Sequence, residues 1–292
     1  MPANNLPAPT RRLPEPKPRE CPPTHSAPKS APDPQTETVI LLHGSGGSGA
    51  SWRRISDALR PLCQIVAPDL IGYGGSPRWP AGTPLDLDAE CRALYPVLPC
   101  CASPYHLVGH SYGGVVALHL ALASPTRVRT LTIIEPVFFQ ALRHTGDLES
   151  FDQFCRIRDD FIEALARGER EPAIARFIDF WTGDGAWERM PLAVRDATLK
   201  IADKIVLDWR ASFAANPNLD RLAALGPRTL LLCGDRSPKP MQRLVDALNH
   251  LMPGSERAVI SGADHLLPLS HTQVVTNAII SQLHADAERR AR

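Results

Sequence analysis

Residues 105–123 read YHLVGHSYGGVVALHLALA and place a buried strand, a glycine-flanked serine and an apolar helix in direct succession. The run 105–110 is typical of a strand covered on both faces, and the small and apolar residues of 112–123 predict a helix. Between them, Ser111 occupies the centre of a GxSxG pattern, residues 109–113. A strand that turns sharply into a helix at such a serine lifts the hydroxyl above a sheet, which makes Ser111 a candidate nucleophile.

Strand and helix patterns alternate on both sides of this stretch. Apolar and β-branched runs predict strands at 38–43, 64–70, 105–110, 128–135, 228–234 and 256–261. Helical spacing of apolar residues predicts helices at 51–60, 86–98, 112–123, 239–251 and 273–285. Alternation at these lengths indicates an α/β fold with a doubly wound, mostly parallel sheet of about six strands.

Two segments depart from this alternation. Residues 137–222 contain several helical patterns rich in Phe and Trp and no strand pattern, so we expect an inserted helical cap. The core is then formed by residues 38–136 and 223–292. Residues 1–37 hold eleven of the 29 prolines and little apolar material, which predicts a disordered extension.

Composition excludes several classes of partner. The chain has 32 Lys plus Arg and 31 Asp plus Glu, so no charge excess favours nucleic acid or an anionic membrane. It contains no apolar run of membrane-spanning length and no apolar segment near the N-terminus that resembles an export signal. The seven cysteines lack metal-ligand spacing. We therefore expect a cytoplasmic protein with reduced thiols, acting on a small molecule; the oligomeric state stays open.

A glycine-rich loop, HGSGGSG at residues 43–49, follows the strand pattern at 38–43. In a hydrolase such a loop can aim a backbone N–H at a developing oxyanion, and we expect the amides of Ser45 and Tyr112 to be the paired donors. A phosphate-binding loop is the alternative reading. The GxxxxGK[ST] pattern that such a loop needs is absent from the chain, and the glycine spacing does not fit GxGxxG.

The general base is expected to be His265. It follows the last strand pattern in the loop SGADH, residues 261–265, and strands of a parallel sheet end at one edge, where Ser111 also emerges. His271 is the reserve candidate, although its place at the start of the final helix favours a surface position.

Four motifs in register carry a family resemblance: HG (43–44), DLIGYGGS (69–76), GHSYGG (109–114) and GADH (262–265). In this order and spacing, across roughly residues 38–285, the chain resembles the α/β-hydrolase superfamily. The resemblance implies a serine nucleophile, a histidine base and an acid, with no metal and no cofactor. It is specific for the fold and much less so for a substrate.

The acid departs from the common pattern of that superfamily. Many members carry an aspartate three residues after the glycine that ends the penultimate strand, where this chain has Ser237 after Gly234. Two substitutes exist, Asp235 and Glu135. Glu135 ends the strand that follows the nucleophile helix, an arrangement similar to haloalkane dehalogenase-like members. An unpaired carboxylate there would be costly, and a histidine N–H is a suitable partner, so we favour Glu135 over Asp235.

These residues predict a serine hydrolase that cleaves an ester-type bond of a small or medium apolar substrate through an acyl-enzyme. The aromatic residues of 137–222 suggest an apolar pocket beneath the cap. Thioesterase, lactonase, C–C hydrolase and acyltransferase activity remain alternatives on the same site. A non-catalytic ligand-binding protein on this fold is the alternative of a different class.

Overall fold

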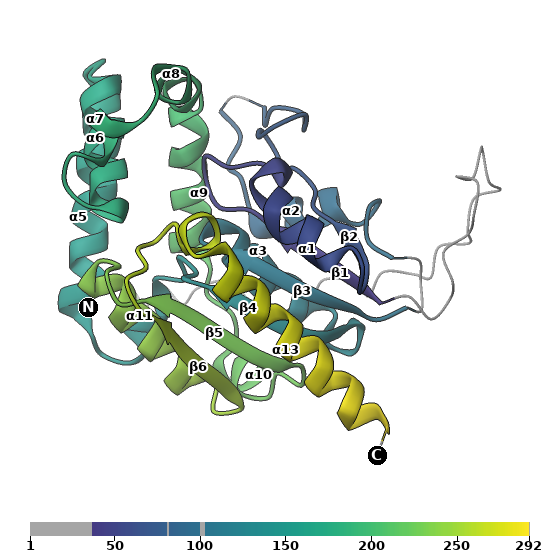
Figure 1. Cartoon of the computed structure of the whole chain (residues 1–292). Helices are drawn as coiled ribbons and strands as arrows, with labels where there is room; N and C mark the ends of the chain where they lie inside the picture. The colour runs from purple at the N-terminus through teal and green to yellow at the C-terminus, as the bar shows by residue number, and fades with distance from the viewer. Residues whose placement is uncertain (1–36, 81, 100–102, 292) are drawn as a thin grey trace, which may run out of the picture.

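The computed structural model describes residues 37–80, 82–99 and 103–291 (Figure 1). The proline-rich extension predicted for residues 1–37 lies outside the described residues except for its last one, Glu37.

A six-stranded parallel sheet forms the centre of the molecule, as predicted. Its order is β2-β1-β3-β4-β5-β6, and every neighbouring pair is parallel. The nucleophile strand β3 therefore lies in the interior of the sheet, with β4 and then β5 beside it. The strands are β1 (Thr38–Leu42), β2 (Gln64–Val66), β3 (Tyr105–His110), β4 (Val128–Ile134), β5 (Arg228–Gly234) and β6 (Ser255–Ile260).

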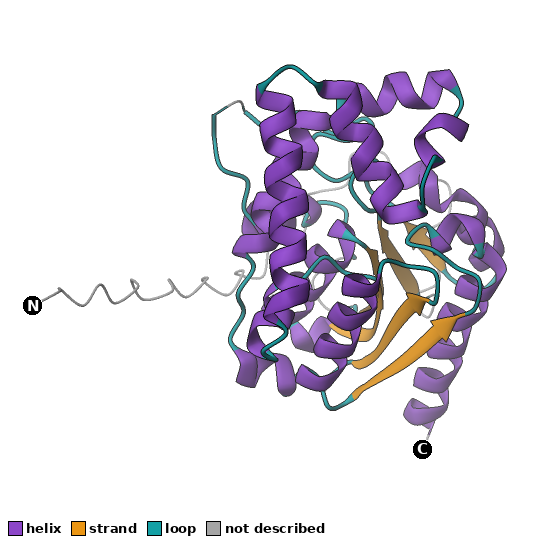
Figure 2. Ribbon diagram, turned by 90° about the vertical axis from the view of Figure 1, so that its left-hand side faces the viewer, coloured by secondary structure: helices purple, strands orange, loops and turns teal. Residues whose placement is uncertain are grey.

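Helices cover both faces of the sheet (Figures 1 and 2). Side chains alternate between faces along a strand, so that Leu41 packs against α1 and α13 while Leu42 belongs to the larger cluster that includes α2 and α3. The helices of these layers are α1 (Arg53–Leu59), α2 (Leu87–Leu94), α3 (Tyr112–Ala123), α11 (Lys239–Leu251), α12 (Leu267–Ser270) and α13 (Thr272–Ala291), with short 3-10 turns η1 (Gly49–Trp52) and η2 (Pro125–Arg127).

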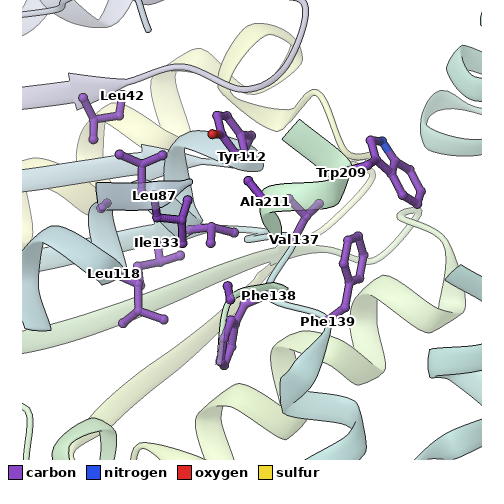
Figure 3. Close-up of a cluster of buried hydrophobic side chains, with 14 of the residues drawn as sticks. Leu42, Leu87, Tyr112, Leu118, Ile133, Val137, Phe138, Phe139, Trp209 and Ala211 are labelled. Carbon is purple, nitrogen blue, oxygen red and sulfur yellow. The ribbon is translucent and has the colours of Figure 1, made fainter. Parts of the chain in front are cut away.

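The larger cluster is continuous from the sheet into the helices between β4 and β5. Figure 3 shows Ile133 of β4 near Leu118 of α3, with Phe139 and Trp209 farther along the same core. Both aromatic side chains are buried, and their ring centroids lie 5.4 Å apart. One hydrophobic core therefore joins the sheet to these helices.

We call residues 137–222 the cap segment. The described chain between β4 and β5 forms helices and contains no strand. They are α4 (Gln140–His144), α5 (Leu148–Ala166), α6 (Arg170–Thr182), α7 (Ala186–Arg189), α8 (Leu192–Lys200), α9 (Ala202–Ala214) and α10 (Leu219–Ala223). In Figure 1, α5 to α9 gather at one end of the sheet, whereas α10 lies near β5 and β6. Over the described ranges, no helix combines the length and apolarity needed to cross a bilayer.

Several predicted boundaries were wrong, and prolines explain two of them. The strand predicted at 64–70 ends at Val66, before Pro68, which has no N–H to donate to a ladder. The helix predicted at 86–98 ends at Leu94, because Pro96 has no N–H to donate to the carbonyl of Arg92 one turn earlier. The last helix extends to Ala291 rather than 285, and its basic end pairs Arg289 with Asp286 at 3.1 Å.

Candidate active site

Ser111 lies at a strained turn between β3 and α3. Its backbone has φ 53° and ψ −118°, a conformation that costs a non-glycine residue free energy. Glycines make the turn possible: a Cβ on Gly109 would lie 2.3 Å from the carbonyl oxygen of Gly113, and one on Gly113 would lie 2.4 Å from that of His43. The GxSxG pattern is thus required by close backbone approach, and it holds the serine above the strand ends.

A chain of two hydrogen bonds joins the three residues favoured from the sequence. Ser111 Oγ lies 3.0 Å from His265 Nε2, and His265 Nδ1 lies 2.7 Å from Glu135 Oε2. All three side chains are buried. With the imidazole proton on Nδ1, His265 donates to the carboxylate and presents a lone pair to the serine hydroxyl.

Glu135 follows β4 in a left-handed backbone conformation, φ 44°, that turns its side chain toward β5. Its second oxygen, Oε1, accepts from Gly234 N–H at 2.7 Å and from Ser237 Oγ at 2.5 Å. Burial alone would raise the pKa of Glu135, but the hydrogen bonds from His265, Ser237 and Gly234 outweigh it and lower the pKa below its usual value. The carboxylate is therefore ionised at neutral pH, with three donors around it.

Ser237 was missed as a contributor to the site. It stands where the superfamily commonly has its acid, and here it donates to Glu135, which follows the neighbouring strand β4. The sequence does show a hydroxyl residue, Ser237, at the position where the acid is usual. Its role could not be inferred there, because the contact depends on β4 lying beside β5.

The alternative acid, Asp235, does not reach His265. Its exposed carboxylate accepts from Gly262 N–H at 2.7 Å and from Ser261 Oγ at 3.1 Å. It thereby shapes the start of the loop that carries His265, without contacting the imidazole. Asp264 likewise serves the loop backbone, accepting from Leu266 N–H at 2.9 Å. The reserve base His271 bonds the exposed Ser270 and is separate from Ser111.

Two aromatic rings position His265. Trp181 of α6 stacks on the imidazole with ring centroids 4.2 Å apart. His110 Nε2 lies 2.8 Å from the His265 carbonyl oxygen and donates to it. Burial lowers the pKa of His110 to about 3, so its ring is neutral and holds the loop by hydrogen bonding without adding charge.

The glycine-rich loop after β1 lies against the serine. A Cβ on Gly44 would be 2.9 Å from Ser111 Cβ, so only glycine permits this approach. Burial lowers the pKa of His43 to about 4, and the neutral ring bonds Gly44 O at 2.8 Å and accepts from Leu70 N–H at 3.0 Å. Within the described chain the amides of Ser45 and Tyr112, the predicted oxyanion donors, make no hydrogen bond to another residue.

A buried cluster of charges links this loop to α9. Asp208 accepts from Ser45 Oγ at 2.6 Å and from Tyr73 OH at 2.5 Å. The Lys204 ammonium bonds the same carboxylate and reaches Glu90 Oε1 at 3.2 Å. Burial raises the pKa of both Asp208 and Glu90, and the ammonium of Lys204 opposes that rise. No local pattern predicts this cluster, because its members outside α9 lie 114 to 163 residues from their partners on that helix.

Replacing Lys204 by methionine is expected to lower the free energy of unfolding by about 3–5 kcal/mol at pH 8, because two buried carboxyl groups lose their cation. Without it their pKa values rise further. A carboxyl group with a raised folded pKa stabilises the native state below that pKa and loses this contribution as pH rises through it. The loss should therefore be smaller at pH 5.

Urea unfolding of both proteins at the two pH values measures this effect. Lys200→Met, on the exposed end of α8, is the matched control and should change stability by less than about 0.5 kcal/mol. A loss that is independent of pH would contradict the assignment of Lys204 as the counter-ion.

A pocket opens directly on Ser111 and His265. It encloses about 560 Å³, the space at its open mouth included. The cap segment supplies most of its wall through α6 and α9. The lining residues are Ser45, His110, Ser111, Val137, Phe139, Phe177, Ile178, Trp181, Thr182, Asp208, Trp209, Ser212, His265 and Leu266. Apart from the site itself, this wall is chiefly apolar and aromatic, as predicted for the space under the cap.

The residues described include one group with metal-ligand spacing, Glu37, His106 and Asp286. His106 lies at the start of β3, at the opposite end of the strand from Ser111. Arginines already neutralise the acids: Arg290 bonds both Glu37 and Asp286. The group is an ion-pair cluster that attaches the last helix to the sheet.

Comparison with known proteins agrees with this geometry. The profile of the alpha/beta hydrolase family matches residues 39–278. The chain belongs to this family. The pimeloyl-[acyl-carrier protein] methyl ester esterase of Aeromonas salmonicida is 36% identical to it over 245 residues, covering 84% of this chain and 88% of the esterase.

Other alpha/beta hydrolases are similar over shorter stretches or in fold only. Lipase LipV of Mycobacterium tuberculosis is 36% identical over 162 residues, 55% of each chain, so the chain spans about half of that relative's length. Among solved structures, MenH from S. aureus superposes with a TM-score of 0.68 at 15% identity, covering 87% of this chain and 96% of MenH. At that identity the likeness concerns the fold alone.

Proposed function

We propose that this alpha/beta hydrolase is a serine esterase, acting on an ester-type bond of a small or medium apolar substrate. The observation that carries the proposal is the unbroken hydrogen-bond chain from Ser111 through His265 to an ionised Glu135. Its Ser111 end opens into an apolar pocket. Neighbouring residues restrain each member: the turn holds Ser111, Trp181 and His110 hold His265, and Ser237 holds Glu135.

In the first step, His265 Nε2 takes the Ser111 proton as Oγ attacks the ester carbonyl. The carbonyl oxygen becomes an oxyanion between the free amides of Ser45 and Tyr112. Glu135 stabilises the imidazolium formed at His265. The imidazolium then returns its proton to the departing alcohol, which leaves the acyl group on Ser111.

Water completes the cycle. His265 accepts a proton from the water as its oxygen attacks the acyl carbonyl, and the imidazolium then protonates Ser111 Oγ as the carboxylic acid departs. The wall formed by α6 and α9 keeps the acyl group in apolar surroundings. The names of two relatives, a lipase and a methyl ester esterase, support an ester as the substrate.

A fluorophosphonate probe tests the proposal. We expect the folded protein to gain the mass of one phosphonyl group, located on Ser111 by peptide mapping, and to lose hydrolysis of p-nitrophenyl esters in parallel. Activated serines react with this probe, whereas ordinary serines do not.

Absence of labelling on the folded protein would contradict the proposed hydrolase activity and favour a non-catalytic binding protein. Labelling combined with hydrolysis of thioesters or lactones, but of no simple ester in a broad panel, would retain the nucleophile and overturn the ester assignment.

A further inference from the structure

The pocket contains several polar side chains, and nearly all of them have protein partners. Ser111 and His265 bond each other, and Ser45 bonds Asp208. The hydroxyl of Thr182 donates to the Ile178 carbonyl at 2.8 Å. These side chains therefore already have hydrogen-bond partners within the protein before a substrate binds.

Ser212 differs from the other polar side chains of the pocket wall. It lies on α9, its exposed fraction is 0%, and its hydroxyl has no hydrogen-bond partner among the described residues. Trp209 and Phe213 flank it on the same helix, and Figure 3 shows Trp209 close to Val137 and Phe139 on this side of the core. A buried hydroxyl without a partner destabilises the folded state. Its presence in the aromatic wall of the pocket indicates that a bound ligand supplies the hydrogen bond.

The position of Ser212 indicates where that partner lies. Asp208 contacts Ser45 of the oxyanion loop, and Ser212 follows it by four residues, about 6 Å farther along α9. Ser212 and Ser111 line the same pocket, and the attacked carbonyl oxygen faces the amides of Ser45 and Tyr112, so a substrate oxygen that meets Ser212 lies outside the scissile ester group.

We infer that Ser212 is a specificity residue whose hydroxyl binds an oxygen atom of the substrate remote from the scissile ester. The substrate class is then an otherwise apolar ester that carries one ketone or hydroxyl group. A serine hydroxyl serves either of these, because it both donates and accepts. This inference rests on the esterase activity proposed above.

Matched pairs of esters test it. On the acyl side, p-nitrophenyl 4-oxopentanoate is compared with p-nitrophenyl pentanoate; on the alcohol side, 3-oxobutyl acetate is compared with butyl acetate. In one of the pairs, Ser212→Ala should lower kcat/KM for the ketone about tenfold more than for the plain ester, since only the ketone loses a hydrogen bond. Comparing each variant with the wild type on the same ester removes differences in intrinsic reactivity.

Thr182→Val is the matched control. It removes a hydroxyl from the same pocket, but one that the Ile178 carbonyl already satisfies, and it should change both members of each pair by the same factor. Isothermal titration calorimetry with 4-oxopentanoate and pentanoate gives a readout without turnover: the wild type should bind the keto acid more tightly, and Ser212→Ala should bind the two alike.

The melting temperature separates this role from a structural one. Removal of an unpartnered hydroxyl should leave the melting temperature of Ser212→Ala unchanged or raise it. A lowered melting temperature, together with equal effects on ketone and plain esters, would show that the hydroxyl serves the fold and would overturn the inference. Hydrolysis of the plain esters by the wild type reports the esterase activity separately, so its failure is distinguishable from the failure of the Ser212 role.

Discussion

Ser111→Ala is expected to lower kcat for ester hydrolysis by a factor on the order of 10⁵ to 10⁶, the scale seen when a serine hydrolase loses its nucleophile. In the proposed mechanism, alanine removes the atom that forms the acyl-enzyme and leaves the pocket and the amides of Ser45 and Tyr112 in place. Substrate should still bind, so KM is expected to change far less than kcat. Steady-state kinetics with a p-nitrophenyl ester measure both quantities.

The same variant should lose fluorophosphonate labelling, whereas Ser270→Ala, at an exposed serine, should label like the wild type. Activity in Ser111→Ala above about a hundredth of the wild-type rate would point to a different nucleophile.

Glu135→Gln is expected to lower kcat by roughly 100- to 10,000-fold. The glutamine oxygen can keep the hydrogen bonds from Gly234 and Ser237, so its amide group faces His265 Nδ1. That N–H donor favours the tautomer with its proton on Nε2, the nitrogen that must accept from Ser111. The variant also lacks the negative charge that stabilises the imidazolium.

Asp235→Asn is the comparison for this second prediction. Asp235 contacts Gly262 and Ser261 and does not touch the imidazole, so its loss should be much smaller. Because the pKa of Glu135 is lowered, the wild-type carboxylate stays ionised across the neutral range, and the difference between the two variants should persist at every pH from 6 to 9. A larger loss in Asp235→Asn would reassign the acid.

The local sequence does not show which of the two carboxylates, Glu135 or Asp235, contacts His265. Each follows a strand, and each was a reasonable partner for His265. The choice depends on the sheet order: β4 lies between β3 and β5, so a side chain at its end has Ser111 on one side and Gly234 and Ser237 on the other. Asp235, at the end of β5, lies beside β6 and bonds the loop that leaves it.

The buried charges of Lys204, Asp208 and Glu90 were even harder to predict from the sequence. Lys204 and Asp208 are spaced as an ordinary helical pair, which on a sequence favours a solvated face. In the folded protein both are buried, and the third charge, Glu90, comes from α2 in the core. Burial of an ion pair requires partners that desolvate and satisfy it together, and those partners come from remote parts of the chain.

For Ser111, adjacent residues are enough to predict the turn, the strand before it and the helix after it, because these depend on glycine sterics and apolar periodicity. The alternation of elements also predicts a mostly parallel sheet of about six strands, and the structure has six strands with every neighbouring pair parallel. The contact of Glu135 with His265, the bond from Ser237 and the burial of the Ser212 hydroxyl become visible in the folded chain alone. Those are relations between side chains brought together by packing, and their energies depend on burial that no single stretch of the chain contains.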